Sequence, residues 1–211
     1  MLSNKSCLII SGGDFSAALP DTRFDYIIAC DRGYSYAKRL NLTPDIIIGD
    51  FDSSEKPKTD IPVIEHPVMK DDTDTMLSVR HALEKGFGNI HIICALGGRF
   101  DHLFANIQSL AFAAAEGAAA FIHSEDTEIS VFSGEMNFPK KEGWSLSCFA
   151  LSDECTGVSV KGTKFECENA QFSNSFPIGA SNVWKENAAA VKCKKGIMMV
   201  VESKLKSGEH I

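Results

Sequence analysis

Ile46-Ile47-Ile48-Gly49-Asp50-Phe51-Asp52 is an apolar run that stops abruptly in glycine and two aspartates. Three further segments have the same form, Leu8–Asp14, Ile27–Gly33 and Ile92–Asp101. Continuous isoleucine-rich runs are typical of strands buried on both faces, as in a parallel sheet. Because the loops at the carboxyl ends of such strands form the ligand crevice, the sequence predicts that glycine and carboxylate gather along one edge.

The segments between these runs continue an alternation of strand and helix. Helices are expected at residues 34–40, 74–85 and 101–116, and strands at 62–66 and 118–123. Gly86 and Gly88 are expected to end the helix at 74–85, since glycine commonly follows a helix. The alternation predicts an α/β domain of doubly wound type, with a mostly parallel sheet, over residues 1–125.

Near residue 126 the pattern changes to short alternating runs. Trp144–Cys148 alternates apolar with small polar residues, and Ala190–Lys194 alternates apolar residues with lysine. Turn signals such as Lys195-Gly196 separate the runs. Residues 126–211 are therefore expected to form a small antiparallel β domain, a sandwich or a barrel.

The composition excludes several classes of protein. The 211 residues carry a formal net charge of −7, which argues against a general nucleic-acid or acidic-membrane surface. The seven cysteines form no CxxC pair, so buried reduced thiols in a reducing compartment are expected. The alanine-rich stretch Leu103–Ile122 is interrupted by Asn106 and Glu116, and it predicts a buried helix and no membrane span. Because residues 1–5 lack a signal-peptide layout, we expect a cytoplasmic protein.

Asp50 and Asp52 are the sharpest local signal for a metal. In an extended segment the two side chains point to the same side. They follow a buried strand, where paired carboxylates can hold Mg²⁺ against phosphate oxygens. The alternative is a simple turn, since aspartate, glycine and serine all favour turns.

Asp71-Asp72-Thr73-Asp74 places three more acids just before a predicted helix. Thr73 or Asp74 suits the N-cap position, and acids favour the positive end of a helix. Capping accounts for one or two of these acids. It does not account for a third acid on the same side of the molecule as Asp50.

Two glycine pairs suit an anion. Gly97-Gly98-Arg99 follows a strand and opens a helix, where backbone N–H groups and the fork of Arg99 match phosphate. Gly12-Gly13 is a weaker signal, because the chain has neither a P-loop nor a full dinucleotide fingerprint. The alternative is a plain strand-to-helix turn, which leaves Arg99 unexplained.

Taken in order, these motifs resemble those of the thiamine pyrophosphokinase family. The resemblance extends from Gly12 to about Val200, which is nearly the whole chain. The matching segments are Gly12-Gly13, Asp31-x-Gly33, Pro44-Asp45, Gly49–Ser53, Asp71-x-Thr73-Asp74, Gly97–His102, Gly162–Phe165 and Ser181-Asn182.

The resemblance implies an α/β N-terminal domain that binds nucleotide and metal, and a C-terminal β-sandwich domain that binds thiamine. It also implies a homodimer. The implied reaction transfers a pyrophosphoryl group from ATP to the hydroxyl of thiamine, with Mg²⁺, and gives thiamine diphosphate and AMP.

The resemblance further implies a role for individual residues. The expected Mg²⁺ ligands are Asp50, Asp52 and Asp74. The expected catalytic acids are these three together with Asp71. The expected ATP-binding residues are Gly12, Gly13, Asp31, Gly33, Gly97, Gly98, Arg99, Asp101 and His102. The expected thiamine-binding residues, contributed across the dimer, are Thr163, Phe165, Ser181 and Asn182.

Two positions depart from the family pattern. Arg32 stands where the family often has a second glycine, and its side chain either touches phosphate or faces solvent. Phe165 stands where the family often has tryptophan. The smaller ring is expected to weaken stacking on the thiamine cation while keeping the same mode of binding.

Two rival functions use the same residues. The acids also suit a metal-dependent phosphoester hydrolase. Alternatively, the chain is a non-catalytic nucleotide-binding module, although its full set of acids argues against this. Formation of AMP only in the presence of thiamine separates the transferase from both rivals.

Overall fold

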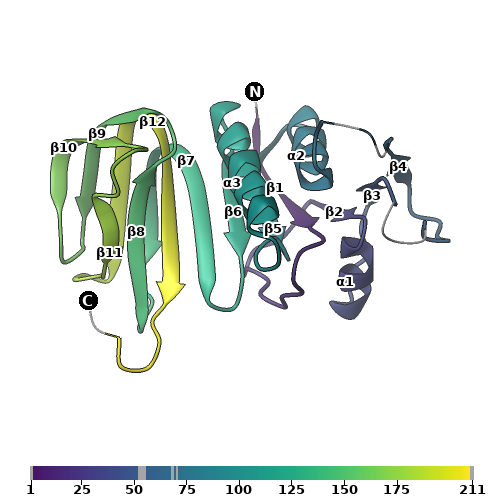
Figure 1. The fold of residues 1–211 in the computed structure, drawn as a ribbon, viewed down its shortest axis with the longest axis horizontal. Helices are drawn as coiled ribbons and strands as arrows, with labels where there is room; N and C mark the ends of the chain where they lie inside the picture. The colour runs from purple at the N-terminus through teal and green to yellow at the C-terminus, as the bar shows by residue number, and fades with distance from the viewer. Residues whose placement is uncertain (1, 52–55, 68, 70, 210–211) are drawn as a thin grey trace. The chain divides into compact units, whose positions relative to one another are not determined.

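The computed structural model describes residues 2–51, 56–67, 69 and 71–209. The chain forms two compact units, Met1–Glu125 and Asp126–Ile211, which we call unit 1 and unit 2. Figure 1 shows the strands and helices of each unit. The division falls where the sequence changes from strand–helix alternation to short alternating runs.

Unit 1 is built on a parallel sheet. Its described strands are β1 (Ser3–Ile10), β2 (Tyr26–Cys30), β3 (Ile46–Gly49), β4 (Val63–Glu65), β5 (Phe87–Ile93) and β6 (Ala119–His123). Their order across the sheet is β6-β5-β1-β2-β3-β4. Ile9, Ile28 and Ile92 lie in register on neighbouring strands and are fully buried. The isoleucine runs therefore form strands covered on both faces, as their sequence predicted.

Helices cover both faces of this sheet (Figure 1). The described helices of unit 1 are α1 (Gly33–Arg39), α2 (Asp74–Glu84) and α3 (Phe100–Ala115). The chain steps one way across the sheet through α1 and the opposite way through α2 and α3. Because such crossovers are right-handed, the opposite steps place α1 on one face and α2 and α3 on the other. Contacts of α1 with β1 and β2, and of α2 with α3, agree with this arrangement.

The ends of α2 show how local sequence sets the helix boundaries. The Thr73 hydroxyl accepts a hydrogen bond from the Met76 N–H at 3.1 Å, so Thr73 is the N-cap. Gly86 follows the helix with a φ of 82°. Gly88 lies inside β5, so the prediction that it helps to end the helix is wrong. A Cβ on Gly88 would lie 2.3 Å from the Ser3 carbonyl oxygen, so glycine is needed there for the close approach of β1.

The strand order reverses at β1. From β1 the chain moves outward to β4 and then returns to β5 and β6 on the other side. In open α/β sheets, ligands bind in the crevice at the carboxyl ends of the strands beside such a reversal. Because the strands are parallel, the loops after β1, β2, β3 and β5 all reach this edge.

Unit 2 is antiparallel throughout its described strands. These are β7 (Thr127–Pro139), β8 (Trp144–Ala150), β9 (Glu154–Lys161), β10 (Cys167–Ser173), β11 (Gly179–Asn182) and β12 (Ala188–Lys204). β12 pairs with β7 along both of its halves, with β9 along its first half and with β8 along its second. One buried core, including Phe132, Leu146, Val160 and Met198, joins these strands.

The cysteines of both units are free thiols. All but Cys167 are buried. Burial raises the pKa of Cys148 to about 12, so this thiol is neutral at physiological pH. These side chains serve as small apolar residues of the two cores.

Candidate active site

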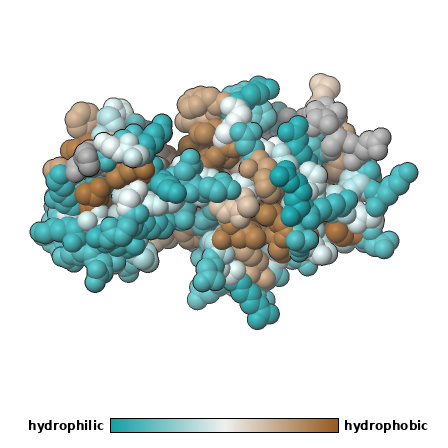
Figure 2. Space-filling view, turned by 90° about the horizontal axis from the view of Figure 1, so that it is seen from below, coloured by the Kyte–Doolittle hydropathy of each residue, from teal (hydrophilic) through white to brown (hydrophobic). Residues whose placement is uncertain are grey.

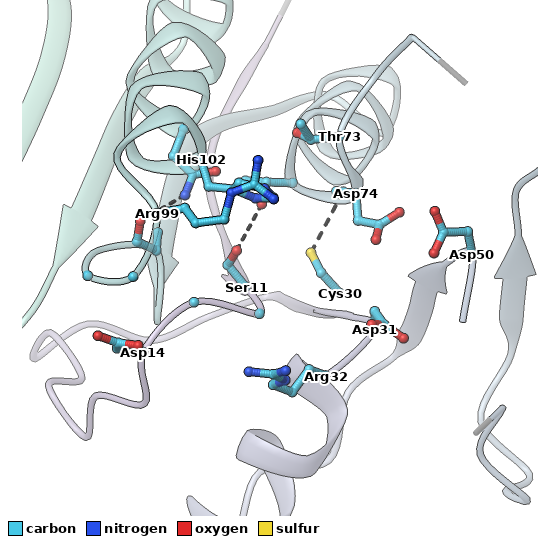
Figure 3. Close-up of a pocket in the computed structure, with 17 residues that line it drawn as sticks. Ser11, Asp14, Cys30, Asp31, Arg32, Asp50, Thr73, Asp74, Arg99 and His102 are labelled. Carbon is cyan, nitrogen blue, oxygen red and sulfur yellow. Dashed lines mark hydrogen bonds between the residues drawn. The ribbon is translucent and has the colours of Figure 1, made fainter. Parts of the chain in front are cut away.

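The loops after β1, β2, β3 and β5, with the starts of α2 and α3, line one pocket (Figure 3). The cavity has a volume of about 490 Å³. The predicted site residues that line it are Gly12, Gly13, Asp31, Asp50, Asp74, Gly97, Gly98, Arg99 and His102. The parallel sheet thus gathers residues from well separated segments of the sequence at one edge.

The backbone at three of these strand ends is strained. Asp31, Phe51 and Cys94 adopt the left-handed conformation, with φ of 39°, 54° and 56°. Such a conformation costs a residue other than glycine about 1–3 kcal/mol, and it persists where the surrounding structure enforces it. The Asp31 N–H donates to the Ile48 carbonyl oxygen at 3.0 Å, which ties the end of β2 to β3. Strain of this kind clusters at ligand sites.

The fold places only some of the predicted acids in the pocket. Asp50 and Asp74 point toward one another in the pocket (Figure 3). Asp71 is exposed and is not part of the pocket lining. Asp72 accepts a hydrogen bond from Nε of Arg80 at 2.8 Å, so it belongs to a surface ion pair. Asp52 lies outside the described residues.

The pocket acids fit a divalent cation that binds together with a phosphate. Mg²⁺ prefers oxygen ligands and commonly takes one or two carboxylates, several waters and the phosphates of a substrate. Asp50 and Asp74 provide two carboxylates in one pocket. In the part of the chain that the structure describes, no group of three or more His, Cys, Asp or Glu could hold a metal ion. Two carboxylates suit a cation whose other ligands include the phosphate oxygens of a bound nucleotide.

The predicted glycines fall into two groups. Gly97 and Gly98 line the pocket with φ of 80° and 65°. A Cβ on Gly97 would lie 2.1 Å from Oδ2 of Asp14, so glycine lets that carboxylate pack against the turn. Gly33 is buried at the start of α1 and is not part of the pocket lining. A Cβ there would lie 2.0 Å from the Ile10 carbonyl oxygen, so glycine is needed to pack α1 onto β1, and the role of Gly33 in ATP binding stays a prediction.

Arg99 is paired with an acid of its own turn. Its Nε donates to Oδ1 of Asp101 at 3.1 Å, and its Nη2 donates to Oδ2. The hydrogen bonds from Arg99 lower the pKa of Asp101. Arg99 and His102 line the pocket, whereas Asp101 does not. Asp101 takes the Nε–Nη2 edge of the guanidinium, so an incoming phosphate meets the remaining Nη donors of Arg99.

Several pocket residues were not among the predicted ones. They are Ser11, Asp14, Cys30, Arg32, Thr73, Thr75, Ala95 and Asn106. The amide of Asn106 donates to the Ala95 carbonyl oxygen at 2.8 Å. A polar residue within an alanine-rich helix was a usable signal for Asn106. The hydroxyls of Ser11 and Thr75 lie 2.8 Å apart although the residues are 64 positions apart, and nothing in the sequence pairs them.

In unit 2, Thr163, Phe165 and Asn182 form one hydrogen-bonded cluster. Nδ2 of Asn182 donates to Oγ1 of Thr163 at 3.1 Å and to the Phe165 carbonyl oxygen at 2.7 Å. Oδ1 of Asn182 accepts from the Phe165 N–H at 3.0 Å. Asn182 is 8% exposed and Thr163 is fully buried. The Asn182 amide, predicted to bind thiamine, is thus engaged in holding the turn that carries Phe165.

Phe165 and Ser181 are the accessible members of the predicted thiamine set. Phe165 is 60% exposed, and Nζ of Lys164 lies 5.3 Å from the centroid of its ring. The ring thus already has a cation over it, which is the contact expected for thiamine. Ser181 is exposed with a φ of 57°, and its N–H donates to Oγ of Ser147 at 3.0 Å.

Both units expose large apolar side chains. In the space-filling view, apolar areas are bordered by hydrophilic residues (Figure 2). The exposed large hydrophobic residues are Leu19, Met69, Phe100 and Phe104 in unit 1 and Phe165, Phe176 and Ile178 in unit 2. Phe100 and Phe104 are one helical turn apart on α3, so they share a face beside Arg99.

Fold and pocket together define a class of protein. An acidic, glycine-rich pocket at the strand reversal of a parallel sheet is typical of enzymes that handle phosphate groups with a divalent cation. Here that α/β unit is joined to an antiparallel β unit with an exposed aromatic ring.

Within this class, the chain belongs to the thiamin pyrophosphokinase family. The model of the thiamin pyrophosphokinase catalytic domain matches residues 22–136. The model of the thiamin pyrophosphokinase vitamin B1 binding domain matches residues 135–198.

Named relatives and solved structures agree with the family. A thiamine pyrophosphokinase of Bacillus subtilis (strain 168) is 27% identical over 184 residues, which cover 83% of this chain and 86% of the relative. Thiamin pyrophosphokinase 1 of Caenorhabditis elegans is 29% identical over 170 residues, covering 75% of this chain and 70% of the relative. A crystal structure of thiamine pyrophosphokinase from Bacillus subtilis is 25% identical, has a TM-score of 0.83 and covers 95% of this chain and 99% of its own. A Geobacillus thermodenitrificans structure, 24% identical with a TM-score of 0.80, shares the fold over 96% of this chain and 99% of its own.

No helix among the described residues is both long enough and apolar enough to cross a bilayer.

Proposed function

We propose that the pocket of unit 1 binds ATP with Mg²⁺ and that the accessible residues of the unit 2 cluster bind thiamine. The chain is an enzyme that transfers a pyrophosphoryl group from ATP to thiamine. The products are thiamine diphosphate and AMP. The observation that carries the assignment of the site is the pair Asp50 and Asp74, which face one another beside two glycine turns in a single pocket.

Asp50 and Asp74 are the residues we assign to the metal, with Asp52, which lies outside the described residues, as a third ligand. When bound, Mg²⁺ neutralises charge on the phosphate oxygens and so stabilises the transition state of the transfer. The chain contributes the two carboxylates that would hold the cation beside the phosphates. Asp74 is the first residue of α2, and Asp50 directly follows the buried strand β3.

The polyphosphate lies, in this proposal, along the two glycine turns. Gly12 and Gly13 follow β1, and Gly97 and Gly98 follow β5, so the turns flank the strand reversal. The Tyr36 hydroxyl donates to the Gly13 carbonyl oxygen at 3.0 Å and fixes the first turn. In-line attack by the thiamine hydroxyl on the β-phosphorus releases AMP, and positioning supplies most of the catalysis for such transfers.

A carboxylate of the pocket accepts the proton of the attacking hydroxyl. Asp71 and Asp74 are the two candidate proton acceptors. We assign the role to Asp74, because Asp74 lines the pocket and Asp71 is exposed outside it.

Phe165 is the residue we assign to stacking on thiamine, since its ring is exposed and thiamine is a cation with two aromatic rings. Ser181 is assigned a hydrogen bond to the pyrimidine edge. Asn182 and Thr163 act one step away, as positioning residues that hold the Phe165 turn.

We also propose that the chain acts as a homodimer in the cytoplasm. Exposed aromatic side chains on both units, such as Phe100 and Phe176, support an interface with a second copy. Seven free cysteines support a reducing compartment.

A product assay tests the function. Purified protein is incubated with ATP, Mg²⁺ and thiamine, and the products are separated by chromatography. We expect thiamine diphosphate and AMP in equal amounts, and neither product when thiamine or Mg²⁺ is left out. Asp50→Asn is the matched control, provided that its melting temperature is unchanged. It should form both products far more slowly than the wild type.

Two results would contradict the transferase. AMP or ADP formed without thiamine indicates a hydrolase. ATP binding without any product indicates a nucleotide-binding module.

A further inference from the structure

Acidic side chains outnumber the arginines in the pocket. Four aspartates and two arginines line it, so the lining is negative before any metal binds. Arg32 enters from the turn between β2 and α1, and Arg99 from the turn between β5 and α3 (Figure 3). A nucleoside triphosphate brings further negative charge into this pocket. The cationic side chains that line it therefore contribute to how well such a ligand is held.

The two arginines differ in their partners. One edge of the Arg99 guanidinium, Nε and Nη2, is taken by the carboxylate of Asp101 through two hydrogen bonds. The guanidinium of Arg32 makes no ion pair and no side-chain hydrogen bond with any other residue that the structure describes. It thus lines a pocket that also contains Asp14 and Asp31 and yet keeps its donors available.

The backbone of Arg32 is held in place on both sides. Asp31 is fixed in a left-handed conformation, with a φ of 39°. Gly33 is packed so closely on β1 that an added Cβ would lie 2.0 Å from the Ile10 carbonyl oxygen. The Arg32 carbonyl oxygen accepts from the Ser35 N–H at 2.9 Å and from the Ser35 hydroxyl at 2.8 Å. Such a rigid base for a guanidinium that pairs with no other described residue is typical of a preorganised binding residue.

The side chain also begins beside the first glycine turn. A Cβ on Gly12 would lie 3.6 Å from the Cβ of Arg32, so the arginine side chain starts next to the turn assigned to polyphosphate. The planar guanidinium forms bidentate hydrogen bonds with phosphate oxygens.

We propose that Arg32 binds the polyphosphate chain of ATP and is the principal arginine of this pocket for that ligand, in place of Arg99. The inference rests on the proposed function, since it names the substrate group that Arg32 contacts in the same site. It assigns Arg32 to the phosphates and not to the base or the ribose.

The test compares ligands and variants by isothermal titration calorimetry with Mg²⁺ present. The ligands are ATP, inorganic tripolyphosphate and AMP, and the variants are Arg32→Ala, Arg32→Lys and Arg99→Ala. Arg32→Ala should weaken binding of ATP and of tripolyphosphate by about ten- to a hundredfold, the size expected for a lost hydrogen bond to a charged group. Binding of AMP and the KM for thiamine should change less than twofold.

The other variants sharpen the result. Arg32→Lys should keep part of the affinity, because lysine retains the charge and loses the fork. Arg99→Ala should weaken ATP less than Arg32→Ala does. Arg23→Ala, the same charge change at an exposed position that does not line the pocket, is the matched control and should bind ATP like the wild type.

Three outcomes would overturn the inference. ATP affinity of Arg32→Ala within twofold of the wild type is one, and an equal loss for AMP and ATP is another. The third is a loss for Arg99→Ala that is larger than the loss for Arg32→Ala. These outcomes are distinct from a failure of the proposed function, in which the wild type binds ATP and forms no thiamine diphosphate.

Discussion

The candidate sites of the two units are built in different ways. In unit 1 most of the predicted residues lie in the loops after parallel strands or at the starts of α2 and α3, and the sheet topology brings them to one pocket. In unit 2 the predicted residues depend on one another, since Asn182 holds Thr163 and the backbone of Phe165 by hydrogen bonds. A site made by topology tolerates changes of single side chains without losing its shape. A site made by a side-chain network couples binding to local stability.

The acids of unit 1 should show the largest effect of any single change. Asp50→Asn removes a charge from the metal site and keeps the shape, so we expect activity to fall at least about a hundredfold, because metal stabilisation of such transfers amounts to several kcal/mol. The melting temperature should stay within about a degree. Asp72→Asn is the matched control, since Asp72 pairs with Arg80 and should leave the rate unchanged. Full activity in Asp50→Asn would mean that Asp50 serves only to form the turn and binds no metal.

The exposed ring of unit 2 should show the next largest effect. Phe165→Ala should raise the KM for thiamine about tenfold, which corresponds to a cation–π contact of 1–2 kcal/mol, and should leave the KM for ATP unchanged. The change in melting temperature should be small, because Phe165 is 60% exposed and loss of its ring leaves no buried cavity.

Phe165→Trp separates stacking from packing. Indole is the better partner for a cation, so this variant should keep or lower the KM for thiamine. A large drop in melting temperature for Phe165→Ala with an unchanged thiamine KM would remove the ring from the binding site.

Asn182 should couple stability to binding. Asn182→Ala leaves the Phe165 backbone groups without partners, so we expect a loss of about 1–3 kcal/mol of unfolding free energy together with a several-fold rise in the thiamine KM. Thr163→Val, which removes one hydroxyl of the cluster, should show both effects to a smaller degree. If the thiamine KM rises and the melting temperature does not move, Asn182 contacts thiamine directly and the contrast between the units is lost.

Mild acid should affect unit 1 before unit 2. Burial and the neighbouring His123 lower the pKa of His91 to about 4, against a value of 6.5 for the unfolded chain. Stabilisation from neutral His91 is therefore complete above pH 6.5 and is lost as the pH falls toward 4. Between pH 7 and pH 5 we expect unit 1 to lose about 2 kcal/mol of stability.

The two units can be followed separately in that experiment. Both tryptophans, Trp144 and Trp184, lie in unit 2, and the described helices all lie in unit 1. The melting midpoint from helical circular dichroism should fall between pH 7 and pH 5 more than the midpoint from tryptophan fluorescence. His91→Phe, which keeps an aromatic ring beside Phe121, should remove the difference. Equal shifts of both midpoints in the wild type would show that the units do not respond separately.

Much of this molecule is predictable from sequence because its signals are local. The isoleucine runs give the strands, and Thr73 marks the start of α2. The ordered motifs indicate the family, whose catalytic-domain model matches residues 22–136. Gly88 was misplaced because a glycine needed for a close strand approach looks, in sequence, like one that ends a helix.

The sequence by itself determined the strand–helix alternation, the change near residue 126, the residue types of the site and the family. Only the tertiary structure decided which of those residues meet. It put Asp74 in the pocket and left Asp71 outside, packed Gly33 against β1, and paired Arg99 with Asp101 while Arg32 kept its donors available. The physical reason is that backbone propensity and the pattern of burial depend on residues that are close together in the sequence. Contacts such as Ser11 with Thr75, or Asn182 with Phe165, arise only when packing brings distant segments within hydrogen-bond reach.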